Sequence, residues 1–197
     1  MIVRSDSPRK VLVITYYWPP SGGSAVLRWL KFARYLHEFG WLATIYTPSN
    51  PEPQAFDQAL LKEIPDSVTV IKRKIREPYR IFKILTGQKY NDTLTASFVS
   101  EREKGWIYGL LIWIRGNFFI PDARKLWIRP SIRYLAKYLD DNPHDAVVST
   151  GPPHSMHLIA MGIKARLNIP WVADFRDPWT NIDFYNELKL SSGADRK

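Results

Sequence analysis

The sequence contains no cysteine among its 197 residues. Disulfide bonds, thiolate zinc sites and cysteine nucleophiles are therefore excluded, and a small disulfide-stabilised secreted scaffold is excluded with them. A reducing compartment suits such a chain, so we expect a cytoplasmic protein. With 45% apolar and 24% charged residues, the composition is typical of a globular protein and not of a disordered or fibrous one.

Long apolar runs are also missing. The longest, residues 106–114, has nine residues, whereas a helix that spans a bilayer needs about 20. Residues 1–10 carry charges and a proline but no apolar segment of the kind found in signal peptides. We therefore expect no membrane span and a single domain, residues 1–197, without internal repeats.

The two common glycine-rich nucleotide motifs, GxGxxG and GxxxxGK[ST], do not occur. Their absence argues against NAD and ATP as ligands. We expect the protein to use no cofactor and no metal.

Positive charge is abundant: 28 Lys and Arg stand against 19 Asp and Glu, a formal net charge of +9. The excess lies in residues 72–89 and 115–137, and the rest of the chain is about neutral. Such a concentration favours an anionic partner: nucleic acid, lipid headgroups or a phosphorylated substrate. The sign of the charge alone does not distinguish among the three.

Short β-branched runs alternate with helical stripes along the chain. The run at 11–14 predicts a strand that is buried on both faces. Further strands are predicted at 41–46, 68–71, 145–149 and 171–173. Helices are predicted at 26–37, 55–62, 122–140 and 154–167. This order predicts a Rossmann-like α/β fold, with a parallel sheet flanked by helices.

Residues 76–140 interrupt this alternation, and we expect them to form a helical insertion rich in basic and aromatic side chains. Pro130 is expected to kink or restart a helix there. At the other end of the sequence, residues 191–197 are polar and are expected to fray.

Ligands of open parallel sheets bind beyond the carboxyl ends of the strands, so the loops at those ends are candidate sites. The first such loop contains Gly22 and Gly23, which allow the backbone to approach a ligand closely, and Ser24, which is expected to cap the next helix. A phosphate would suit the start of that helix. An ordinary turn that needs glycine is the alternative.

The second loop, Ser149–Ser155, places His154 at the start of a helix. The helix N-terminus disfavours the imidazolium form, and a neutral imidazole suits contacts with sugar hydroxyls. A capping or surface histidine is the alternative. His157, one turn later, is expected on the helix surface.

The third loop, Asp174–Trp179, has one carboxylate on each side of Arg176: Asp174 before it and Asp177 after it. This arrangement could form an ion-pair network that anchors the loop, or it could bind a polar substrate. Both interpretations stay open at this point.

Taken together, these loops resemble the N-terminal domain of retaining glycosyltransferases with the GT-B fold, of the family 4-like class that uses nucleotide sugars to build bacterial surface polysaccharides. The matching segments occur in the same order along the chain: Tyr16–Pro20 with Gly22 and Gly23, Arg28, Pro121–Asp122 with Trp127, Ser149–Ser155, and Asp174–Trp179.

The resemblance implies two Rossmann-like domains that face each other across a cleft, of which this chain is the acceptor-side one. Gly22 and Gly23 would then approach the diphosphate of the donor, and His154 would be the catalytic residue that contacts the donor sugar. The acceptor side would be lined by Arg28, Asp174, Arg176 and Asp177. Because the C-terminal donor domain is missing from this sequence, the domain alone is expected to be inactive.

Lipid-linked acceptors are common in such pathways, so the resemblance also suggests a use for the basic and aromatic segments. We expect them to rest on anionic headgroups at the inner face of the plasma membrane. The predicted membrane-contact residues are Trp106, Trp113, Arg115, Arg124, Lys125, Trp127 and Arg129. The alternative is that these aromatic side chains pack in the core or against the missing domain.

Two other function classes compete with the enzyme hypothesis. A non-catalytic nucleic-acid-binding module would use the same charge and aromatic side chains on single strands. The sequence holds no recognition motif for nucleic acid, so that partner is disfavoured. A peripheral membrane or assembly protein would use the same surface without catalysis.

Overall fold

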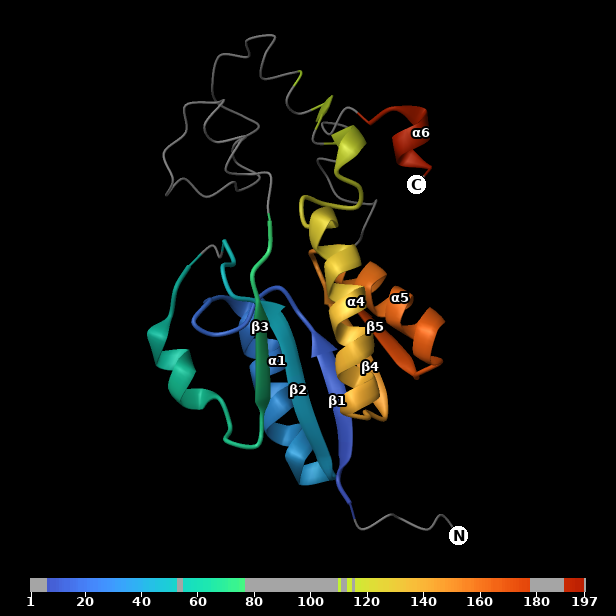
Figure 1. Cartoon of the computed structure of the whole chain (residues 1–197). Helices are drawn as coiled ribbons and strands as arrows, with labels where there is room; N and C mark the ends of the chain where they lie inside the picture. Colours follow the sequence, from blue (N-terminus) through green and yellow to red (C-terminus); the bar gives the residue numbers. More distant parts are fainter. Residues whose placement is uncertain are drawn as a thin grey trace.

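The computed structural model describes residues 7–52, 55–76, 110, 113–114, 116–177 and 190–196. Five strands form one sheet in the order β3-β2-β1-β4-β5, and every neighbouring pair is parallel (Figure 1). The strands are β1 (Arg9–Ile14), β2 (Trp41–Pro48), β3 (Thr69–Arg73), β4 (Ala146–Gly151) and β5 (Trp171–Phe175). The predicted Rossmann-like α/β fold is confirmed.

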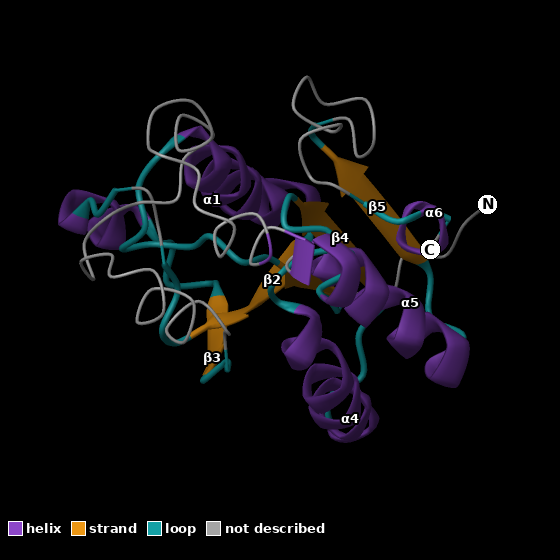
Figure 2. Ribbon diagram, turned by 90° about the horizontal axis from the view of Figure 1, so that it is seen from above, coloured by secondary structure: helices purple, strands orange, loops and turns teal. Residues whose placement is uncertain are grey.

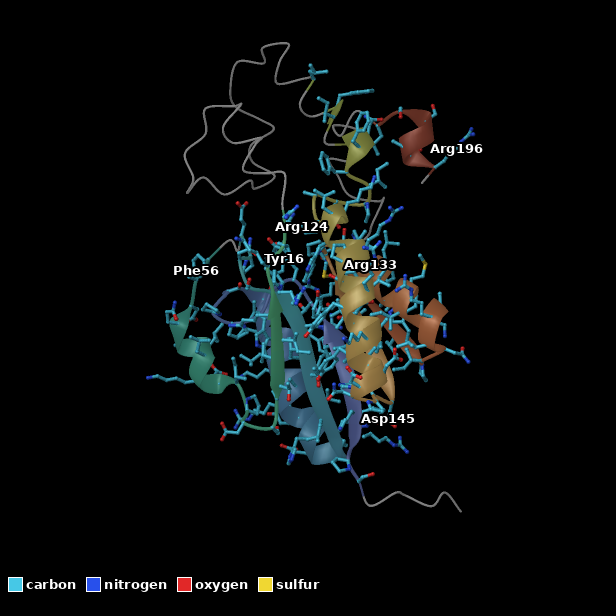
Figure 3. All side chains as sticks on the ribbon, in the orientation of Figure 1. Tyr16, Phe56, Arg124, Arg133, Asp145 and Arg196 are labelled. Atoms are coloured by element: carbon cyan, nitrogen blue, oxygen red, sulfur yellow. The ribbon has the colours of Figure 1, made fainter. Side chains whose placement is uncertain are left out.

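Helices cover both faces of the sheet. The helical elements include α1 (Ser24–Leu36), α4 (Lys125–Asp141), α5 (Ser155–Leu167) and the 3-10 segments η1 (His37–Phe39) and η2 (Gln58–Glu63). The short α6 (Ser192–Asp195) lies beyond the ends of the strands (Figure 1). Figure 2 shows α1 on one side of the sheet and α4 and α5 on the other. In Figure 3, Tyr16 marks the edge where the strands end and Asp145 the opposite edge.

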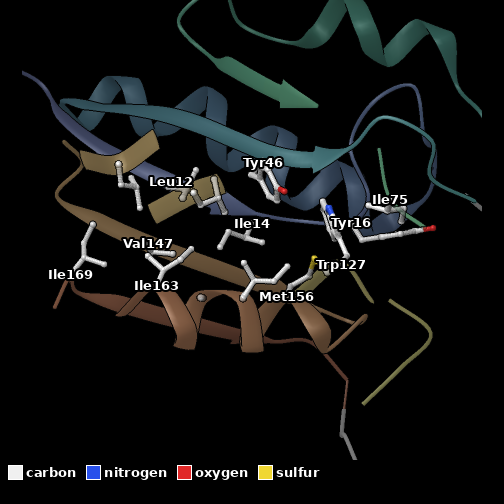
Figure 4. Close-up of a cluster of buried hydrophobic side chains, with 14 residues drawn as sticks. Leu12, Ile14, Tyr16, Tyr46, Ile75, Trp127, Val147, Met156, Ile163 and Ile169 are labelled. Atoms are coloured by element: carbon white, nitrogen blue, oxygen red, sulfur yellow. The ribbon is translucent and has the colours of Figure 1, made fainter. Parts of the chain in front are cut away.

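The sequence of the central strand β1 is continuously apolar because both of its faces are buried. Val11 and Val13 belong to the core under α1, whereas Leu12 and Ile14 belong to the core under α4 and α5 (Figure 4). Successive side chains of a strand point to opposite faces, so a strand covered on both sides needs an unbroken apolar run.

Helix α4 corrects the prediction for the end of the insertion. Its Leu135 and Leu139 are buried in the core on the sheet, so this part of 76–140 belongs to the domain itself. Pro130 lies inside α4, and the helix continues through it. Trp127 is only 2% exposed and stacks on Tyr46, with ring centroids 5.1 Å apart. The prediction that Trp127 contacts a membrane is therefore wrong, because the residue lies on the buried face of α4.

The remaining boundaries differ in detail from the sequence prediction. The expected helix at 55–62 is the 3-10 segment η2, and Ser192–Asp195 form α6 although this end was expected to fray. Most of the predicted insertion, residues 77–109, lies outside the described part of the chain. Among the helices that are described, none is both long enough and apolar enough to cross a membrane.

Candidate functional site at the carboxyl ends of the strands

The candidate site lies between β1 and β4. The chain first adds β2 and β3 on one side of β1 and then adds β4 and β5 on the other side. β1 pairs with β2 on one side and with β4 on the other. The chain leaves β1 toward α1 on one face and leaves β4 toward α5 on the other face. In open parallel sheets, such a switch point forms the crevice in which ligands bind. The first two candidate loops of the sequence therefore meet here.

The first candidate loop, which contains Gly22 and Gly23 and is called the glycine loop below, leads into helix α1. Gly23 precedes α1 with φ +99° and ψ 168°, a backbone conformation that is essentially restricted to glycine. Gly22 is fixed by its N–H, which donates to the carbonyl of Ala55 at 2.8 Å. Ser24 is the first residue of α1, so the prediction that it caps the helix is wrong. Within the described residues no side chain caps α1, and its first turn contains no acid.

Helix α5 differs from α1 because a carboxylate lies at its start. Asp122 approaches its first turn from the segment before α4, and its Oδ2 accepts a hydrogen bond from the Ser155 N–H at 2.8 Å. Its Oδ1 accepts from the Ser155 hydroxyl and from the Arg124 N–H, each at 2.8 Å. A carboxylate thus occupies the helix terminus that could otherwise bind an anion. This role of Asp122 was not predicted from the sequence, although the residue lies in one of the matching segments.

His154 immediately precedes α5 and is half-buried. Burial lowers the pKa of His154 below its usual value, and the nearby carboxylates of Asp122 and Asp177 oppose this effect only in part. The imidazole is therefore neutral at pH 7, as expected. The cause differs from the predicted one, because burial has the largest effect and Asp122 already neutralises the helix terminus.

His157 contradicts its predicted surface position. Only 3% of the residue is exposed. Its Nδ1 lies 2.8 Å from the Ser149 hydroxyl, which accepts a second hydrogen bond from Trp171 Nε1. The ring also stacks on Phe175, with centroids 4.1 Å apart. Burial and the neighbouring His154 lower the pKa of His157 to about 4. The apolar residues around it in α5 were a signal that this helix is buried on more than one side.

Asp174, the first residue of the third loop, is bonded to helix α1 and to the second loop. Its Oδ1 accepts from Arg28 Nη2 at 2.9 Å. Its Oδ2 accepts from Trp29 Nε1 and from the Thr150 hydroxyl, both at 2.9 Å. The structure thus brings the predicted acceptor-side residues Arg28 and Asp174 into contact. It favours the anchoring interpretation of this carboxylate, because both oxygens are engaged.

The other charged residues of this loop differ in their surroundings. The Arg176 guanidinium is half-buried and donates to the backbone carbonyls of Gly151 and Pro152. Asp177 is exposed. An acceptor-binding role for either residue stays a prediction.

Apart from the buried Trp127, the predicted membrane-contact residues separate into three groups. Trp113, Lys125 and Arg129 are exposed. Arg124 is half-buried, with its guanidinium 4.4 Å from the centre of the Tyr16 ring and its Nη2 donating to the Tyr16 hydroxyl. Its side chain turns toward the strand ends, and a contact with headgroups stays a prediction for this residue. The remaining two, Trp106 and Arg115, lie outside the described residues.

No group of three or more His, Asp or Glu side chains in the described ranges is arranged to hold a metal ion.

Comparisons with known proteins give distant structural similarities only. No protein-family model and no curated protein sequence matches the chain. The C-terminal domain of PF1911 hydrogenase from Pyrococcus furiosus is 13% identical, with a TM-score of 0.44 over 88% of this chain and 96% of its own. UGT2 from Phytolacca americana, in a complex with UDP-2fluoro-glucose and pterostilbene, is 14% identical with a TM-score of 0.46. A UDP-glucosyltransferase from Polygonum tinctorium is 16% identical with a TM-score of 0.43.

The coverage of these plant enzymes is partial. The matches include 87% and 88% of this chain but only 31% of each plant enzyme. The chain thus spans about a third of the length of the plant enzymes it matches.

Proposed function

We propose that this chain is the acceptor-side domain of a retaining glycosyltransferase with the GT-B fold. The reaction would transfer a sugar from a nucleotide-sugar donor to a saccharide or lipid-linked acceptor, in the synthesis of a cell-surface polysaccharide. The proposal rests on the ordered resemblance of the loop sequences and on the site geometry. The nucleotide sugar is the substrate, and we expect the enzyme to use no cofactor.

The observation that supports this function best is the contrast between the two helix termini at the crevice. The start of α5 is occupied by Asp122, whereas the first turn of α1 has no acid and no side chain in the described residues caps its N–H groups. The helix dipole and these N–H groups suit the diphosphate of a sugar donor. Arg28, one turn into α1, is 45% exposed but is paired with Asp174, and we keep it on the acceptor side of the proposed site.

His154 supplies the group for the sugar itself. As a neutral imidazole it can both donate to and accept from sugar hydroxyls. We assign it the contact with the donor sugar near the reacting carbon, in agreement with the sequence resemblance. A hydrogen-bonding side chain that is held in place and acts mainly in the transition state lowers the barrier of the chemical step.

Activity of the full-length protein with a panel of nucleotide sugars and lipid-linked acceptors tests the proposal. His154→Ala should lower kcat and kcat/KM together, by roughly 10²- to 10³-fold, as for other well-placed donors in a water-excluded site. His37→Ala is the matched control, because His37 is exposed in η1. Equal losses in the two variants, or full activity of His154→Ala, would contradict the role of His154.

The domain alone presents one wall of the cleft. One wall cannot enclose a donor or exclude water, so residues 1–197 should bind nucleotide sugars only weakly and turn over none. Calorimetry on the chain measures this directly. Micromolar affinity for any nucleotide sugar would argue against a two-domain site.

We also propose a reversible attachment to anionic membranes at the inner face of the plasma membrane. Four basic side chains follow one another at four-residue spacing on the exposed side of α4: Lys125, Arg129, Arg133 and Lys137. Each basic residue near an anionic surface contributes about 1 kcal/mol, and salt weakens the effect.

Sedimentation with anionic and neutral vesicles tests the attachment. Binding should require anionic lipid and should weaken as salt rises, and replacing these four residues with glutamine should abolish it. Equal binding to both vesicle types would exclude the electrostatic attachment. Tighter binding to single-stranded nucleic acid than to vesicles would instead favour the nucleic-acid-binding alternative.

A further inference from the structure

Hydrogen bonds connect the C-terminal end of β5 and the residue after it to the C-terminal end of β4 and the loop that follows. Asp174 accepts from the Thr150 hydroxyl at 2.9 Å. Two residues later, Arg176 Nε donates to the Gly151 carbonyl and Arg176 Nη2 to the Pro152 carbonyl, each at 3.0 Å. The Arg176 N–H also donates to the Gly151 carbonyl, at 3.3 Å. One side chain thus holds two consecutive carbonyls of the loop that carries His154.

The other side of this loop is closely packed. A Cβ atom on Gly151 would lie 2.7 Å from His157 Nε2 and 3.2 Å from His154 Nδ1, so no larger residue fits there without a shift of these rings. The ring of Phe175, which lies between Asp174 and Arg176, stacks on His157. The loop is therefore held by the Arg176 guanidinium on its carbonyls and is packed against the buried His157 imidazole, on which the Phe175 ring stacks.

We infer that Arg176 is a positioning residue for His154 and not a residue that binds the acceptor. This inference rests on the proposed role of His154 and deepens it. A guanidinium has a planar fork of donors, and here two of its nitrogens are already directed at main-chain oxygens. Because the held carbonyls lie three and two residues before His154, the guanidinium fixes the chain that orients the imidazole.

The two roles of Arg176 predict different kinetics. A residue that binds the acceptor contributes to the acceptor KM. A residue that positions His154 acts on kcat, and its effect disappears once His154 is gone. A double-mutant cycle in the full-length protein therefore separates the two roles.

We expect Arg176→Ala to lower kcat on the order of 10²-fold, the loss that accompanies a displacement of about 1 Å at a catalytic group. The acceptor KM should stay unchanged, and Arg176→Ala should cause no further loss in the His154→Ala background. Additive losses, or a tenfold rise in the acceptor KM without a change in kcat, would overturn the assignment. Arg166→Ala is the matched control, because Arg166 is exposed in the last turn of α5.

A second measurement does not depend on activity. NMR of the His154 imidazole in the full-length protein should show shifted and broadened resonances in Arg176→Ala and unchanged ones in Arg166→Ala. If Arg176→Ala unfolds, Arg176→Lys replaces it, since lysine keeps the charge but cannot span both carbonyls in a fork. Wild-type His154 resonances in a folded Arg176 variant would overturn the inference. Full activity of His154→Ala would contradict the proposed function alone, and the NMR result would still decide the role of Arg176.

Discussion

Two helices begin at the same edge of the sheet, and their first turns are built differently. At α5, Asp122 accepts two hydrogen bonds from Ser155 at the helix start, and the loop before it is fixed by Arg176. At α1, Gly23 leads into the helix without a capping side chain. At the first terminus a carboxylate accepts the N–H of Ser155, whereas at the second no side chain in the described ranges accepts a hydrogen bond from the first turn.

In the proposed transferase, this difference would separate two tasks of the site. The loop before α5 is closely packed and holds a neutral histidine in a fixed place, which suits a contact that must be preorganised. The start of α1 offers backbone N–H groups and a helix dipole, which suit a phosphate group of any nucleotide. Sugar recognition and anion binding would thus come from different faces of the same sheet.

The largest expected effect on stability concerns Asp122. Asp122→Ala removes three hydrogen bonds to a carboxylate and the cap of α5, so it should lower the free energy of unfolding by about 3 kcal/mol. Urea denaturation measures the loss. Asp140→Ala, at the exposed end of α4, should change stability by less than about 0.5 kcal/mol. Equal effects of the two substitutions would show that Asp122 does not stabilise the start of α5.

A pH-dependent effect should come from His157. Its pKa is about 4 in the folded protein because of burial, while an unfolded chain has the ordinary value of 6.5. Below pH 6.5 the unfolded state takes up the proton first, so the stability present above pH 6.5 is lost as the pH falls toward 4. The loss between pH 7 and pH 5 should be about 2 kcal/mol.

Urea denaturation at several pH values tests this effect. His157→Gln should remove that part of the pH dependence, whereas His37→Ala, at an exposed site, should retain it. An unchanged pH dependence in His157→Gln would contradict the burial of a neutral His157.

The smallest effect should occur at the glycine loop. Gly23→Ala places a Cβ on a backbone with φ +99°, so it should cost about 1.5 kcal/mol. Gly22→Ala is the matched control, because the added Cβ would meet Asp57 Cβ at an ordinary 3.5 Å. Thermal denaturation compares the two variants. A Gly22→Ala protein that is less stable than Gly23→Ala would contradict the conformation of this loop.

Local sequence patterns were sufficient to predict the strands and the position of His154. The apolar run at 11–14 and the strand-to-helix boundary before His154 depend on residues close in sequence. The role of Asp122 could not be predicted in this way, because its hydrogen bonds reach Ser155, 33 residues away. The burial of Trp127 did have a local signal, since it precedes Leu135 by eight residues and therefore shares its face of α4.

The central claim is that an anion binds at the start of α1 and not at the start of α5. Amide NMR of the chain during a titration with millimolar UDP measures this most directly. We predict the largest shifts at the N–H groups of Gly23, Ser24 and Ala25, with little change at Ser155 and Met156. Shifts confined to the start of α5, or none at the start of α1, would contradict the claim.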